Sequence, residues 1–185
     1  MRRAVGDDVR SYPDVNRGYS ETKAAIETIR AMQAEAGIIA VEQPVEGLAA
    51  MKRVVDGVDV PVIVDEGCWS PQDAIEVVQA AAADLLSIYY TKAAGLIRAM
   101  EIGAIGRAAG LPTNVNGSLE GGVGNAANLH LAAALENDAA AGAQGDRAQG
   151  LARPPAARVR RGAGHHEHAH ARGALRAGRA RGARR

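Results

Sequence analysis

The sequence predicts an α/β fold in which helices cover a parallel sheet, as in part of a (β/α)₈ barrel. Short apolar runs alternate with segments of helical periodicity at about 23 to 28 residues per unit, the spacing typical of strand–helix units. The clearest apolar run is Ile38–Glu42, which ends in a carboxylate and is followed by Pro44. Continuous apolar runs are typical of strands buried on both faces, and proline cannot donate a hydrogen bond to a sheet.

The first half of the chain has the patterns of strands and helices in alternation. Ser20 is typical of a helix N-cap, and Gly37 is typical of the residue that closes a helix. The inward face of that helix is expected to carry Ala25, Ile26, Ile29 and Met32. In chain order we expect a weak strand, a helix, a strand, a helix and a strand over residues 9–15, 20–37, 38–42, 48–57 and 60–65.

The second half repeats the alternation. Ser70-Pro71 is a strong helix start, because a capping hydroxyl precedes a proline at the first helical position. Strand, helix, strand and helix are then expected over residues 85–90, 96–109, 112–116 and 123–136. The predicted inward faces of the helix that starts at Pro71 and of the last helix are Ala74, Ile75, Val78 and Ala81, and Leu129, Leu131 and Ala134.

Length and composition fit an ordinary globular domain, with 185 residues and 47% hydrophobic residues. The single cysteine, Cys68, excludes an internal disulfide and is compatible with a reducing compartment. No apolar run approaches the ~20 residues of a membrane span, and residues 1–8 lack the apolar core of a signal peptide. We therefore expect a cytoplasmic protein without membrane contact.

The composition changes near residue 137. From residue 141 onward the chain has eleven arginines, no lysine and only two acids, although the whole chain has a net charge of only +1. The large aliphatic residues of this part are Leu151, Val159 and Leu175. Such a segment buries too little apolar area to offset its chain entropy. We therefore expect one domain over residues 1–137 and a disordered tail rich in Arg, Ala, Gly and His over residues 138–185.

Three successive strand ends carry a carboxylate: Asp14, Glu42 and Asp65. Neighbouring parallel strands lie about 4.8 Å apart, so these carboxylates could converge on one point. Unpaired, they would raise one another's pKa, whereas Mg²⁺ accepts oxygen ligands and removes the repulsion. A single acid at a strand end is more simply a helix cap or a solvated charge. Three in register favour a metal site.

Four short stretches follow one another in a specific order: Asp14–Tyr19, Val41–Pro44, Pro61–Glu66 and Lys92–Leu96. Together they resemble the barrel domain of the enolase superfamily, in particular the mandelate racemase/muconate lactonizing enzyme group. The resemblance covers about residues 5–137 and implies a TIM-type barrel with Asp14, Glu42 and Asp65 as magnesium ligands. It also implies a reaction in which a base removes the proton α to a carboxylate and the metal stabilises the enediolate.

This resemblance implies a magnesium-dependent racemase, cycloisomerase or dehydratase that acts on a small carboxylic acid. Full-length relatives are expected to form homo-oligomers. The sequence shows only about five of the eight strands that a complete barrel needs. The capping domain and the first two barrel strands, which often carry a second base, are not found before Asp14. We therefore expect a truncated barrel that is inactive, or nearly so, by itself, and we interpret the tail as a frameshift in a GC-rich gene.

The residue at the position of the expected base also differs from the pattern of the group. Many members of this group carry a lysine at the end of the sixth strand, 24 residues after the third metal ligand, where this chain has Tyr89. A phenol, whose pKa in water is near 10, needs a nearby cation to act as a base. The alternatives are that Tyr89 is a catalytic residue or a wall of the pocket. Lys92, three residues later, either takes part in catalysis or forms a salt bridge.

The loop after the seventh strand resembles the substrate-facing loop of the group. Asn114 and Asn116 point to the same side of a strand, and with Glu120 they are the expected substrate-binding residues. The glycine-rich run at residues 121–124 either binds an anion through backbone N–H groups or forms a flexible turn. It lacks the Gly-x-Gly-x-x-Gly spacing of a nucleotide site.

Three other interpretations remain open. The arginine-rich tail could make the protein a non-catalytic polyanion-binding protein, although the tail has no aromatic residue for specific nucleic-acid recognition. The histidines of residues 165–170 could bind a transition metal. Alternatively, a partial barrel with two raw sheet edges could aggregate and have no function.

Overall fold

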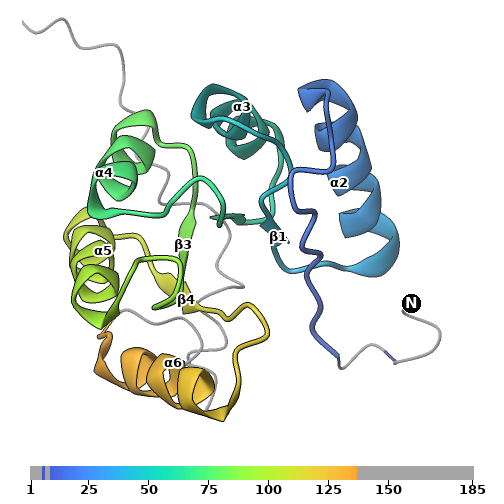
Figure 1. The fold of residues 1–185 in the computed structure, drawn as a ribbon. Helices are drawn as coiled ribbons and strands as arrows, with labels where there is room; N and C mark the ends of the chain where they lie inside the picture. The colour runs from blue at the N-terminus through green and yellow to red at the C-terminus, as the bar shows by residue number, and fades with distance from the viewer. Residues whose placement is uncertain (1–5, 7–8, 137–185) are drawn as a thin grey trace, which may run out of the picture.

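The computed structural model describes residue 6 and residues 9–136 of the chain. Within them a parallel sheet has the strand order β1-β2-β3-β4, and helices follow the strands along its outer side (Figure 1). The elements are α2 (Thr22–Ala36), β1 (Val41–Glu42), α3 (Leu48–Gly57), β2 (Val62–Val64), α4 (Pro71–Ala80), β3 (Leu85–Ile88), α5 (Leu96–Ala109), β4 (Thr113–Val115) and α6 (Gly122–Ala134). The prediction of an α/β fold built from strand–helix units is confirmed.

The two faces of the sheet carry different side chains. Side chains along each strand point alternately to the two faces of the sheet. Those on the outer face pack with the helices in one large core, which includes Val41, Val62 and Leu86. Ala40, Ile63 and Leu85 form a separate small cluster on the opposite face, which corresponds to the inside of a barrel. The polar residues at the strand ends lie on this inner face.

The strands are shorter than predicted. β1 contains Val41–Glu42 rather than residues 38–42, although the backbone N–H of Ile39 still donates to Ser11 O at 3.0 Å. The weak strand over residues 9–15 is reduced to an isolated parallel bridge between Asp14 and Glu42. The row of hydrogen-bonded segments therefore extends from Asp14, beside β1, to β4.

Helix ends follow local chemistry. Ser70 caps α4 as predicted, since its hydroxyl accepts the N–H of Asp73. Gly37 and Gly110 close α2 and α5 in the left-handed conformation. The prediction of Ser20 as an N-cap is wrong: the N-cap of α2 is the next residue, Glu21, which makes no side-chain cap.

Two predicted helix faces are wrong in part. Ile75 is 44% exposed and Ala81 is exposed, while Val77 takes the inward position on α4. On α6, Leu129 is 71% exposed and Ala134 is also exposed, while Asn128 is buried. Asn128 can face inward because its side-chain carbonyl accepts the N–H of Tyr90 at 3.1 Å, a hydrogen bond that a hydropathy pattern does not reveal.

The predicted boundary at residue 137 and the expected disordered tail lie outside the described residues, as do the arginines and histidines of the tail. Within the described part of the chain, no helix combines the length and apolarity needed to cross a membrane.

Candidate active site

The strand register places the three acids on one face of the sheet. Asp14 pairs with Glu42, and Glu42 pairs with Ile63. Asp65 follows Ile63 by two residues, so their side chains point to the same side. Because parallel strands end at a common edge, Asp14, Glu42 and Asp65 lie along the carboxyl edge of the inner face, as the sequence predicts.

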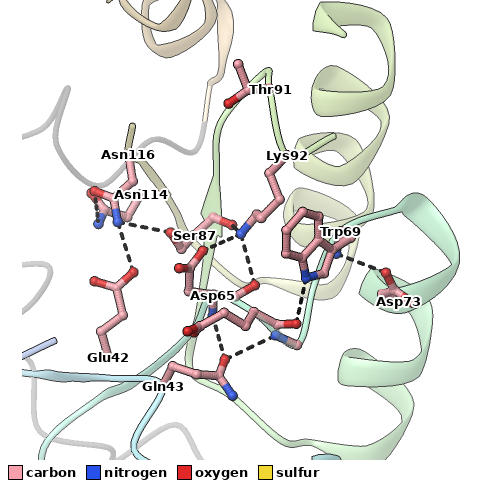
Figure 2. A network of polar contacts seen from close by, with 12 residues as sticks. Glu42, Gln43, Asp65, Trp69, Asp73, Ser87, Thr91, Lys92, Asn114 and Asn116 are labelled. Atoms are coloured by element: carbon pink, nitrogen blue, oxygen red, sulfur yellow. Dashed lines mark hydrogen bonds and ion pairs between the residues drawn. The ribbon is translucent and has the colours of Figure 1, made fainter. Parts of the chain in front are cut away.

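Glu42 is the most buried of these acids, with 2% of its surface exposed. Its Oε1 accepts the Nδ2–H of Asn116 at 2.9 Å, and the same amide donates to Ser87 Oγ at 3.0 Å (Figure 2). Burial, followed by the charges of Asp14 and Asp65, raises the pKa of Glu42 to about 7. Glu42 is therefore partly protonated near neutral pH.

Asp65 is paired with Lys92, whose side chain is fully buried. The Lys92 ammonium donates to Asp65 Oδ1 at 2.5 Å, to Asp65 O at 2.9 Å and to Ser87 O at 2.8 Å. An ammonium has three N–H groups, so all of them are used. Lys92 therefore ties the end of β2 to the end of β3 and supplies one buried positive charge beside the acids.

Asp14 is held differently. Its Oδ1 accepts the backbone N–H of Asn16 at 3.1 Å, which forms a local turn. Asn16 and Arg17 both have positive φ, at 49° and 60°. Arg17 N also donates to Gln43 O at 2.7 Å, so the turn is fastened to the segment that follows Glu42.

These residues fit a magnesium ion by the chemistry of their donors. Three carboxylates supply the oxygen ligands that magnesium prefers. In the part of the chain that the structure describes, however, no three acidic, histidine or cysteine side chains are grouped closely enough to hold a metal ion as they stand. Each of the three carboxylates instead accepts a hydrogen bond from another group of the protein.

Gln43 is a site residue that the sequence analysis missed. It is 1% exposed and has a φ of 33°, which is unusual for a residue other than glycine. Its Oε1 accepts the backbone N–H groups of Asp65 at 2.8 Å and Gly67 at 3.2 Å, and its Nε2 donates to Val45 O at 2.9 Å. The sequence does offer one signal for Gln43, because it is a polar residue within a run that is otherwise expected to be buried. The side chain fixes the loop that presents Asp65.

Tyr89 lies beside the Asp65–Lys92 pair. The Lys92 ammonium is 4.7 Å from the centre of the Tyr89 ring. Burial first, and then the charges of Asp65, Glu66, Glu120 and Glu42, raise the pKa of Tyr89 to about 12. This environment favours a protonated phenol at neutral pH.

The expected substrate-binding residues divide into two groups. Asn114 and Asn116 share the inner face with Glu42, and Asn114 Nδ2 donates to Asn116 Oδ1 at 3.2 Å and to Tyr12 OH at 3.4 Å. Glu120 lies apart from them. Its Oε1 accepts the Thr91 hydroxyl at 2.9 Å, and its Oε2 accepts the N–H of Ser118. Their predicted contact with a substrate stays a prediction.

Comparison with known proteins identifies the family. Residues 1–175 match the enolase C-terminal domain-like family. The chain belongs to this family, in the mandelate racemase/muconate lactonizing enzyme group. The family also confirms the predicted fold class, because its solved members are TIM-barrel enzymes.

Two enzymes illustrate the similarity of this enolase-superfamily chain to known proteins. It is 39% identical to the L-Ala-D/L-Glu epimerase of Bacillus subtilis over 140 residues, which are 74% of this chain and 38% of the epimerase. It is 36% identical to muconate cycloisomerase 1-1 of Acinetobacter lwoffii over 137 residues, which are 74% of this chain and 36% of that enzyme. The chain thus spans well under half the length of these relatives.

Two solved structures of epimerases are similar to this chain in fold as well as in sequence. A substrate-liganded complex of the Bacillus subtilis epimerase has a TM-score of 0.72 and 38% identity, covering 74% of this chain and 39% of that one. The dipeptide epimerase of Enterococcus faecalis complexed with Mg and the dipeptide L-Leu-L-Tyr has a TM-score of 0.69 and 34% identity, covering 74% and 39%.

Replacing Glu42 with Gln tests the electrostatics. The pKa of Glu42 rises from 4.5 to about 7 on folding, so the folded state binds the proton more tightly. The contribution of Glu42 to stability therefore falls as pH rises from 4.5 through about 7. Without divalent cations, Glu42→Gln should stabilise the protein by up to about 3 kcal/mol near pH 8 and by little near pH 4. Urea unfolding at both pH values measures this, and equal destabilisation at both would contradict it.

Replacing Gln43 with Met tests the support of Asp65. Methionine has a similar volume but leaves the N–H groups of Asp65 and Gly67 without their acceptor, which should cost about 2 kcal/mol. Amide hydrogen exchange followed by NMR should accelerate at Asp65 and Gly67 more than at core amides. Gln79→Met, on the exposed side of α4, is the control. Unchanged protection of the two amides would show that Gln43 does not hold this loop.

Proposed function

We propose that this chain carries the metal-binding side of an enolase-superfamily active site that acts on a small carboxylic acid. The reaction class is proton removal from the carbon α to the carboxylate, leading to racemisation, epimerisation, cycloisomerisation or dehydration. The observation that carries the proposal is the register that sets Asp14, Glu42 and Asp65 on one face at the carboxyl edge. The relatives support it, since they are epimerases, racemases and cycloisomerases.

In this proposal, Asp14, Glu42 and Asp65 hold Mg²⁺. When bound, the ion supplies positive charge that stabilises the negative charge developing on the substrate carboxylate. The Enterococcus relative complexed with Mg and a dipeptide supports this choice of metal. Lys92 keeps one oxygen of Asp65 turned toward itself, and Asn116 orients Glu42.

The proposed site has no well-placed base among Tyr89 and Lys92. The phenol of Tyr89 stays protonated at neutral pH because its pKa is about 12, so it is suited to donate a hydrogen bond. Lys92 has no free N–H group and no exposed side-chain surface, so it positions Asp65 rather than meeting a substrate. We therefore propose that the chain by itself turns over little or no substrate.

Thermal unfolding with and without Mg²⁺ tests the proposed metal site. A ligand at ten times its Kd that binds only the folded state adds about 1.4 kcal/mol, which should raise the Tm by about 4 °C. Asp65→Asn should abolish this rise. Asparagine is preferable to alanine, because it leaves an acceptor for the buried Lys92 ammonium.

Asp59→Ala is the matched control, since Asp59 is an exposed acid just before β2. It should keep the full response to Mg²⁺. A wild-type Tm that does not respond to millimolar Mg²⁺, or a response that Asp65→Asn leaves intact, would refute the proposed site.

A further inference from the structure

A pocket of about 310 Å³ opens next to the Asp65–Lys92 pair. Its lining residues come from loops at the carboxyl edge of the sheet: Trp69, Tyr89, Thr91, Lys92, Ser118 and Glu120. Neither Asn114 nor Asn116 lines it. Glu42 is not among its lining residues either, so the pocket is distinct from the Glu42–Asn116 contact.

Trp69 forms a rigid aromatic wall. It is 53% exposed, which is unusual for a large apolar side chain, yet both of its N–H groups are held. The indole Nε1 donates to Glu66 O at 2.8 Å, and the backbone N donates to Asp73 Oδ2 at 2.9 Å (Figure 2). An exposed indole that is fixed in place is pre-organised to contact a ligand. Tyr89 also lines the pocket, but its ring already faces the Lys92 ammonium at 4.7 Å.

The charge presented to the pocket is negative. Glu120 is the only acid in the lining, and its hydrogen bonds lower its pKa, so it stays ionised. Its oxygens accept the Thr91 hydroxyl and the Ser118 N–H, and its own backbone N–H and Asn128 also hold its pKa low. The positive charge of Lys92 is directed elsewhere, because its three N–H groups reach Asp65 and Ser87 and its side chain has no exposed surface.

We propose that this pocket binds a positively charged group, so that the substrate is a carboxylic acid whose far end carries an ammonium or guanidinium. An aromatic face attracts a cation through its quadrupole, and a carboxylate forms charge-assisted hydrogen bonds with it. Trp69 and Glu120 supply these two interactions from different loops. The assignment of substrate class rests on the proposed function, whereas binding of a cation in the pocket does not.

Trp69 is the only tryptophan of the chain, so its fluorescence reports directly on the pocket. The probes are butylguanidinium, pentanamide and pentanoate, which have similar size and differ in charge. Butylguanidinium should change the Trp69 emission in a saturable manner, with an affinity about tenfold higher than that of pentanamide, and pentanoate should have no effect. Equal responses to the three probes, or no response to butylguanidinium, would overturn the proposal.

A charge variant sharpens the test. Glu120→Gln should lower the affinity for butylguanidinium about tenfold and leave that for pentanamide unchanged. Glu101→Gln, on the exposed face of α5, should change neither. Because butylguanidinium and pentanamide carry no carboxylate and the titrations are made without Mg²⁺, the experiment is independent of the proposed metal site. A cation response without a Mg²⁺ response would refute the proposed function alone, and the reverse would refute the pocket alone.

Discussion

The parallel register of the strands is the constraint on which the site depends. Parallel strands end at one edge, and alternate residues share a face, so one register decides which side chains meet. Outward-facing Val41, Val62 and Leu86 bury against the helices and fix that register, because a slip by one residue would expose them. The same register turns the acids at the strand ends inward. The apolar core thus holds together side chains that repel one another.

The structure offsets this repulsion only in part. Lys92 supplies one buried positive charge to Asp65, and Asn116 donates a hydrogen bond to Glu42. The pKa of Glu42 stays raised, first by its burial and then by the charges of Asp14 and Asp65. The buried position of Lys92 also explains why this amine is not accessible beside Tyr89. Its three N–H groups are used to hold the ends of β2 and β3 together at Asp65 and Ser87.

Much of this arrangement could be predicted from the sequence, because it follows from local patterns. Apolar runs that end in an acid predict that Glu42 and Asp65 lie at strand ends, where the structure has them. The closing glycine of α5 predicts where this helix ends. Gln43 and Asn128 were not identified, since their burial depends on hydrogen bonds to distant backbone groups that only the tertiary structure brings near. The same cause made the predicted face of α6 wrong in part: Leu131 is buried as predicted, but Asn128 is buried where Leu129 was expected.

The most direct test of the central claim is a titration of the chain with Mn²⁺, in which the EPR signal of the free ion measures binding and Mg²⁺ competes. One Mn²⁺ ion should bind per chain, be displaced by Mg²⁺, and no longer bind in any of Asp14→Asn, Glu42→Gln and Asp65→Asn. Displacement by Mg²⁺ separates this site from the histidines of residues 165–170, because Mg²⁺ prefers oxygen ligands. Absence of binding, or binding that survives all three substitutions, would contradict a metal site built on the three strand ends.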